Sequence, residues 1–102
     1  MIGTREFAMT PEIFSVKFWG VRGSLPVAGP AFQKFGGHTA CIQVTCGNRN
    51  FLFDAGSGIV NAAAELRGLK VGHVDLFFSH SHYDHILGLP YFGPLFDKSM
   101  SV

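Results

Sequence analysis

The sequence predicts an α/β domain in which a mixed sheet carries a helix on one face. Segments that alternate apolar and polar residues indicate strands, and a segment with apolar residues three and four positions apart indicates a helix. An apolar run that leads directly into a polar, histidine-rich cluster indicates one more strand. This order is typical of α/β folds, which place functional residues at the carboxyl ends of strands. With 102 residues, the chain is one small domain.

The first strand is expected over residues 13–19, where Phe14, Val16 and Phe18 share one face. Residues 20–37 follow with five glycines and two prolines, a composition that predicts a long loop. Loops of this length inside compact domains are usually functional or disordered.

A hairpin is expected next, with strands over residues 39–46 and 51–53 joined by a tight turn at 47–50. Cys41 and Cys46 lie five positions apart on the first of these strands, so they point to opposite faces. We therefore expect two separate reduced thiols rather than a disulfide.

A short helix should follow the hairpin, with Ser57 as its N-cap and Gly68 as its stop. Its apolar stripe consists of Ile59, Ala62, Ala63 and Leu66. Residues 74–78 carry apolar side chains on both faces, which predicts an interior strand covered on both sides.

The strand at 74–78 leads into the sequence HSHYDH, which places four candidate metal ligands within six residues: His80, His82, Asp84 and His85. Imidazole nitrogens and carboxylate oxygens are ligands that zinc, iron and manganese accept. In an extended chain the first three would share one side, and a turn into a helix at Asp84 would bring His85 to that side. Four ligands from six consecutive residues suit two adjacent ions better than one tetrahedral ion.

Composition limits the partners and the compartment. The net charge is +1 without a basic run, so no obligatory nucleic acid is expected. No stretch has the roughly 18 apolar residues of a membrane span, and no secretory signal is visible, so we expect a cytoplasmic protein. Residues 1–10 show no periodicity and are interpreted as a disordered or expression-derived leader.

The HxHxDH cluster after an apolar strand resembles the signature of the metallo-β-lactamase-fold hydrolases. Three further segments are similar to a phosphodiesterase-like branch related to the tRNA 3′-processing endonucleases: FWGVRGS at 18–24, GGHT at 36–39 and FDAGSG at 53–58. The likeness covers roughly residues 14–96. It implies that residues 11–102 form the N-terminal αβ half of a four-layer αβ/βα sandwich, whose complete form packs two sheets face to face.

The resemblance also implies roles for the cluster. His80 and His82 would bind a first divalent ion, and Asp84 and His85 a second, with zinc most expected and manganese or iron possible. Asp84 would be the catalytic residue that orients the nucleophilic hydroxide. Asp54 matches the aspartate that supports the ligands from behind.

Two loop residues leave alternatives open. His38 stands where the branch commonly carries Asn, and it is either an additional polar contact near the site or a histidine without a role. Arg22 either contacts a substrate phosphate, which its guanidinium matches, or is solvated.

The implied metal centre is incomplete in this chain. The family adds a third His on the first ion, a bridging Asp and another His on the second ion, all from later in the chain. Residues 86–102 contain no His, and Asp97 is their one acidic residue. His73 opens the strand that ends before His80, so it is too far away to reach the site.

Two functions remain in view. The first is a metal-dependent hydrolase of phosphodiesters or related esters, acting through hydroxide held by two ions on a small phosphate-ester or nucleotide-type substrate. The chain alone would then have little or no activity. The alternative is an inactive metal-binding or self-associating module. An apolar sheet face without a cover, in a chain with 11 Phe residues, would favour a homo-oligomer.

Overall fold

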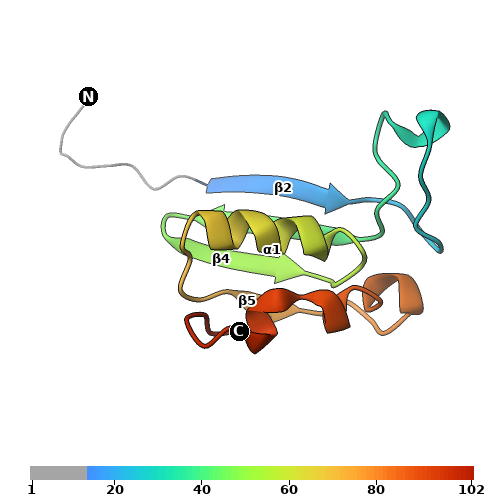
Figure 1. Ribbon diagram of the computed structural model, residues 1–102. Coiled ribbons are helices and arrows are strands. Elements are labelled where there is room, and N and C mark those ends of the chain that lie inside the picture. The colour runs from blue at the N-terminus through green and yellow to red at the C-terminus, as the bar shows by residue number, and fades with distance from the viewer. Residues whose placement is uncertain (1–13) are drawn as a thin grey trace, which may run out of the picture.

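The structure, a computed structural model, describes residues 14–102 and contains one four-stranded mixed sheet (Figure 1). The strand order is β2-β3-β4-β5, with antiparallel β2/β3 and β3/β4 pairs and a parallel β4/β5 pair. The strands are β2 (Phe14–Gly20), β3 (Cys41–Cys46), β4 (Arg49–Phe53) and β5 (Asp75–Phe77). Helix α1 (Ile59–Gly68) connects the parallel pair. The predicted mixed sheet with a helix on one face is confirmed, whereas the expected leader at residues 1–10 and the start of the first strand at Ile13 lie outside the described residues.

The hairpin is confirmed, but both its first strand and its turn are shorter than predicted. The turn is Gly47-Asn48, and Gly47 has a φ of 59°, which a glycine adopts without strain. Strand β3 begins at Cys41 because Thr39 pairs instead with Arg22 in an isolated bridge. Cys41 is buried, and no disulfide joins it to Cys46.

Helix α1 buries the predicted stripe against the sheet, namely Ile59, Ala62, Ala63 and Leu66. The predicted N-cap is wrong: Gly58 holds that position, and the Ser57 hydroxyl instead accepts a hydrogen bond from the Thr39 N–H at 2.9 Å. The predicted stop is also displaced. Gly68 is the last helical residue, and Lys70 takes the left-handed conformation with φ 56°.

Strand β5 was expected to be an interior strand covered on both faces, and this is wrong. It is the last strand of the sheet in the described residues, with β4 as its one neighbour. Its Phe77 side chain is 49% exposed, and the following Phe78 is 45% exposed. Leu76 alone packs against the core from this strand.

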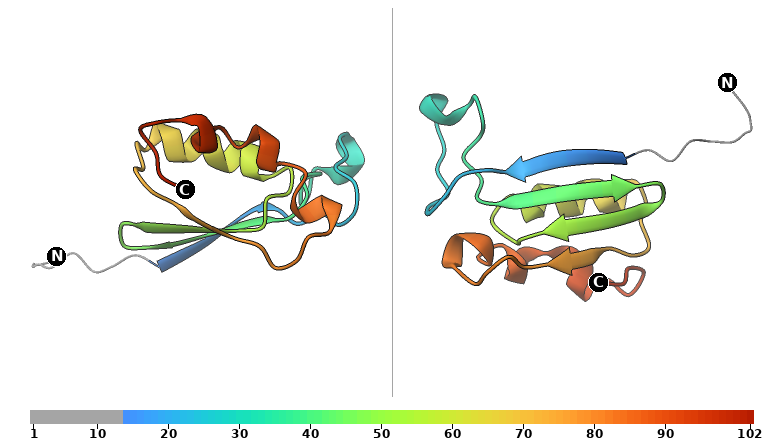
Figure 2. Two further views of the ribbon diagram at one scale, coloured as in Figure 1. Left: turned by 90° about the horizontal axis from the view of Figure 1, so that it is seen from below. Right: turned by 180° about the vertical axis from the view of Figure 1, so that it is seen from behind.

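The two faces of the sheet differ sharply. Helix α1 and the C-terminal segment, which forms the short 3₁₀ helices η3 (Leu89–Tyr91) and η4 (Gly93–Phe96), lie on one side (Figure 2, left). Between them and the sheet lies the core, in which Leu52, Val74 and Phe92 are fully buried. Within residues 14–102 no element covers the opposite face.

The uncovered face is mostly apolar. Strand pairing places on it Phe14, Val16, Phe18, Ile42, Val44, Phe51, Phe53 and Phe77, together with Cys46 and the charged residues Arg49 and Asp75. Phe18 is 64% exposed there.

The described helices include none that is long and apolar enough to cross a membrane.

Candidate metal centre

The candidate site lies where the parallel strands β4 and β5 end side by side. Asp54 follows β4, and its N–H donates to the Phe77 carbonyl of β5 at 2.7 Å. Residues Ser79 and His80 follow β5 at the same edge. The carboxyl ends of parallel strands meet at one edge of the sheet, so this pairing brings the two loops together.

Asp54 is the anchor of the site. It has a φ of 68°, which is uncommon for a residue with a Cβ, and it is 7% exposed. This conformation directs its carboxylate at Ser79, whose N–H donates at 2.7 Å and whose hydroxyl donates at 2.6 Å. Burial opposes ionisation of Asp54, but the Ser79 hydrogen bonds and nearby His85 outweigh it, so its pKa lies below the usual value.

The loop after β5 turns at the 3₁₀ helix η2 (Tyr83–His85) and folds back onto the loop after β4. The Ala55 N–H donates to the His85 carbonyl, and the Gly88 N–H donates to the Ala55 carbonyl, each at 2.8 Å. The sequence anticipated a helix from Asp84 onward. The structure has separate 3₁₀ turns there instead, because Gly88 and Pro90 interrupt the segment.

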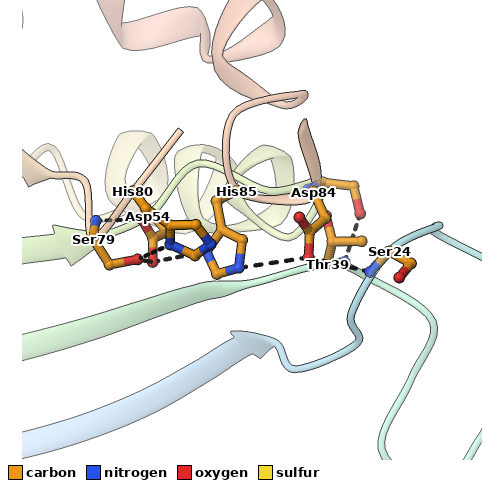
Figure 3. A network of polar contacts seen from close by, with 8 residues as sticks. Ser24, Thr39, Asp54, Ser79, His80, Asp84 and His85 are labelled. Carbon is orange, nitrogen blue, oxygen red and sulfur yellow. Dashed lines mark hydrogen bonds and ion pairs between the residues drawn. The ribbon is translucent and has the colours of Figure 1, made fainter. Parts of the chain in front are cut away.

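The histidines of the HSHYDH cluster lie close together, and Figure 3 shows two of them, His80 and His85, side by side. The His80 ring centroid is 4.5 Å from that of His82 and 4.1 Å from that of His85. The buried Nδ1 of His85 lies 3.0 Å from an Asp54 carboxylate oxygen but makes no well-formed hydrogen bond. The predicted turn of His85 toward His80 is therefore confirmed.

Asp84 extends the network to the loop after β2. The Ser24 N–H donates to its carboxylate at 3.1 Å, and the Nε2 of His85 lies 3.5 Å from the same oxygen (Figure 3). The Ser24 hydrogen bond is the main reason that the pKa of Asp84 lies below its usual value, with the nearby histidines acting in the same direction. Asp84 is thus held in its anionic form, the form that ligates metals.

The side chains fit a metal ion by donor type but not by placement. Among residues 14–102, no group of three or more His, Cys, Asp or Glu side chains is arranged to hold an ion. Three imidazoles and a carboxylate nevertheless stand next to one another, and the buried Nδ1 of His85 faces Asp54 without a well-formed hydrogen bond. In residues 14–102 the donor types therefore suit a divalent ion, whereas their arrangement by itself does not hold one.

The other candidates lie apart from this cluster. His73 pairs with Asp75 at 3.0 Å at the opposite end of β5, which confirms that it cannot reach the site. The Asp97 carboxylate accepts hydrogen bonds from the N–H and the hydroxyl of Ser99. His38 contacts the Ser57 hydroxyl at 3.1 Å and the Asn61 amide at 3.4 Å, near the start of α1.

Sequence reasoning missed two partners of the cluster, Ser24 and Ser79. Ser24 acts through its backbone N–H from 60 positions away, so no side-chain pattern marks it. Ser79 directly precedes His80, and only the structure reveals that it binds the support residue Asp54. The loop segment 18–24, noted for its resemblance, was the one signal that pointed toward Ser24.

Comparison with known proteins gives one match. No curated protein and no solved structure matches the chain significantly. A family model described as the metallo-beta-lactamase superfamily matches residues 35–99, which is more than half of the chain and includes the whole HSHYDH cluster. Proteins of this superfamily generally bind divalent metal ions, in agreement with the donor types gathered here. The chain therefore belongs to the metallo-beta-lactamase superfamily.

Proposed function

We propose that this chain carries the HxHxDH part of the metal centre of a hydrolase that cleaves phosphodiesters or related esters. The observation that carries the proposal is the clustering of His80, His82, Asp84 and His85 beside a buried, anionic Asp54. His80 and His82 would hold one ion, and Asp84 and His85 the other. Two divalent ions, zinc first and manganese or iron as alternatives, would supply Lewis acidity and a water that ionises near neutral pH.

The chain's own residues have positioning tasks in this scheme. Asp54 keeps a negative charge 3.0 Å from the Nδ1 of His85, which favours a proton on that nitrogen and leaves Nε2 for a ligand. The Ser24 N–H holds Asp84 from the other side. Asp84 is the residue proposed to orient the attacking water.

Metal binding is the direct test. We expect the 102-residue chain to bind zinc weakly, and His82→Ala to weaken that binding at least about tenfold. Loss of a residue that only supports a metal ligand already lowers metal affinity by about tenfold or more, and loss of the ligand itself should cost at least as much. Competition against a chromophoric chelator measures both affinities. His73→Ala is the matched control, since His73 lies beyond the opposite end of β5 and should leave the affinity unchanged. Equal affinities for the His82 and His73 variants would place the metal elsewhere.

Hydrolysis tests the reaction class. In a protein that supplies the remaining ligands, bis-p-nitrophenyl phosphate should be cleaved with zinc or manganese and not after chelation. Turnover that is independent of metal would count against the proposal.

The uncovered sheet face supports a second candidate, a self-associating module. Large apolar side chains such as Phe14 and Phe18 are more than half exposed on this face, a state that contact with a second copy would relieve. The four-layer sandwich would cover the same face with a second sheet, so both candidates require a partner surface there.

We expect the chain to sediment as an oligomer at micromolar concentration, and Phe18→Lys to shift it toward monomer by placing a charge on the apolar face. Phe96→Lys is the control, because Phe96 is 77% exposed but belongs to η4, on the covered side. A wild-type chain that is a clean monomer would contradict the self-associating module.

A further inference from the structure

A pocket lies in the loop between β2 and β3, outside the histidine cluster. It has a volume of about 370 Å³ and is lined by residues 21–23 on one side and by Ala31, Phe32 and 34–36 on the other. Ligand pockets generally span about 300–1,000 Å³, so this one suits a small ligand. The loop, which includes the 3₁₀ helix η1 (Pro30–Phe32), projects from the same end of the sheet as η2 (Figures 1 and 2).

The base of this loop is fixed by the backbone. The Arg22 N–H donates to the His38 carbonyl, and the Val27 N–H donates to the Gly37 carbonyl, each at 3.0 Å. A Cβ at Gly37 would collide with the Val27 carbonyl, so glycine permits this close approach. These contacts fix the two ends of the loop to each other at its base.

The charged residues of the pocket are both cationic. Arg22 and Lys34 line it, no acidic residue does, and neither cation has an ion-pair partner among residues 14–102. The Nε of Arg22 donates to the Leu25 carbonyl at 2.9 Å, which orients the guanidinium. Its Nη atoms have no hydrogen-bond acceptor in the described part of the chain. Two uncompensated cations in one hollow attract an anion.

Each cation is accompanied by an aromatic ring. The Arg22 guanidinium lies 4.9 Å from the Phe32 ring centroid, and the Lys34 ammonium lies 5.3 Å from that of Phe35. Phe35 is 74% exposed, which is costly for so large an apolar side chain unless another surface covers it. An exposed ring beside a cation is a stacking surface for a planar group that carries negative charge nearby.

The pocket adjoins the candidate metal centre. Gly23 lines the pocket, and the next residue, Ser24, donates its N–H to Asp84. A molecule bound in the pocket would therefore contact Gly23, whose neighbour Ser24 contacts the proposed metal ligand Asp84.

We propose that this pocket binds a phosphate ester that carries an aromatic ring, a nucleotide-like ligand. Arg22 and Lys34 hold the phosphate oxygens, which the planar guanidinium can engage in pairs. Phe35 stacks on the ring. The pocket's part in substrate selection rests on the hydrolase proposed above, whereas the binding itself requires no metal.

The test titrates the 102-residue chain, in EDTA, with phenyl phosphate, inorganic phosphate and phenol, and follows the amide NMR signals of residues 21–36. Phenyl phosphate should bind in a saturable manner and more tightly than either fragment. Arg22→Gln and Lys34→Gln should each weaken it about tenfold, the expected effect of losing one charged hydrogen bond. Lys98→Gln removes the same charge from an exposed lysine outside the pocket and should change nothing.

The result that would overturn the proposal is absent binding, or binding that Lys34→Gln weakens no more than Lys98→Gln. Lys34 is exposed, so its variant remains informative even if Arg22→Gln does not fold. Equal affinities for phenyl phosphate and inorganic phosphate would overturn the stacking part. Since EDTA excludes metal, failure here is separate from failure of zinc binding at His82.

Discussion

Gly88→Ala should lower the free energy of unfolding by about 3 kcal/mol or more, at the upper end of the range for overpacking. A Cβ at Gly88 would collide with the carbonyl of Gly56 and come within 2.8 Å of the Cγ2 atom of Ile59. Backbone blocks the new methyl group, so no side-chain rotation relieves the collision. The Gly88 N–H also donates to the Ala55 carbonyl, a bond that the displaced loop would lose. Urea unfolding followed by circular dichroism measures the change.

Gly68→Ala is the control for this substitution. Gly68 is the last residue of α1, and a Cβ there meets no atom within 4 Å. Alanine at a helical position is favoured over glycine by about 0.5–1 kcal/mol, so this variant should be as stable as the wild type or slightly more so. If both variants unfolded alike, the close approach of the two loops at Gly88 would not contribute to stability.

The loop displacement has a second consequence. Residues 83–88 carry Asp84 and His85, and Gly88 makes one of the two backbone hydrogen bonds that fix this loop to Ala55 after β4. Gly88→Ala should therefore weaken zinc binding as well as stability, whereas Gly68→Ala should leave it unchanged.

Local patterns in the sequence predicted the elements of this fold well and their surroundings less well. The stripe from Ile59 to Leu66 is buried as predicted, because helical spacing alone determines which residues share a face. The apolar residues of β5 were interpreted as a strand covered on both sides, yet Phe77 is half exposed. The pattern of apolar residues shows which faces of a segment are apolar, but it does not show which element packs on each face.

Competition between distant residues explains the misplaced helix cap. Ser57 is of the right type to cap α1, but Thr39 binds it in two ways: the Thr39 N–H donates to the Ser57 hydroxyl, and the Ser57 N–H donates to the Thr39 hydroxyl. A hydroxyl can satisfy either a local or a tertiary partner, and the sequence does not show which it will take. The Ser24 contact to Asp84 is hidden for a different reason, because a backbone N–H makes it and no side-chain pattern marks a backbone donor.

The candidate site was predictable to the extent that it is contiguous. HSHYDH spans six positions, so its donor types and spacing are visible directly, and the turn that brings His85 to His80 follows from the need for a common side. The left-handed conformation of Asp54 and its two bonds to Ser79 were not predictable, because they depend on how β4 and β5 end relative to each other.

Asp54→Ala should also cost about 3 kcal/mol in the free energy of unfolding. The Ser79 N–H and hydroxyl would lose a charged acceptor that is 7% exposed, and hydrogen bonds to charged groups contribute about 1.5–3 kcal/mol. Alanine must in addition adopt a φ of 68°, which costs about 1–2 kcal/mol for a residue with a Cβ. Asp54→Asn should cost only about 1 kcal/mol, because asparagine tolerates this conformation and its carbonyl can still accept one bond.

Asp97→Ala separates burial from the hydrogen-bond pattern. Asp97 accepts bonds from the Ser99 N–H at 2.9 Å and from the Ser99 hydroxyl at 2.7 Å, the same pair of donors that Asp54 receives from Ser79. Its side chain is 33% exposed, so water can replace the lost acceptor and the cost should be clearly smaller than that of Asp54→Ala. If the Asp97 and Asp54 alanine variants lost similar amounts of unfolding free energy in the same urea measurement, the burial and backbone strain of Asp54 would not add to its contribution. A larger loss for Asp54, accompanied by weaker zinc binding, would mean that the buried carboxylate holds His85 in the position the metal centre requires.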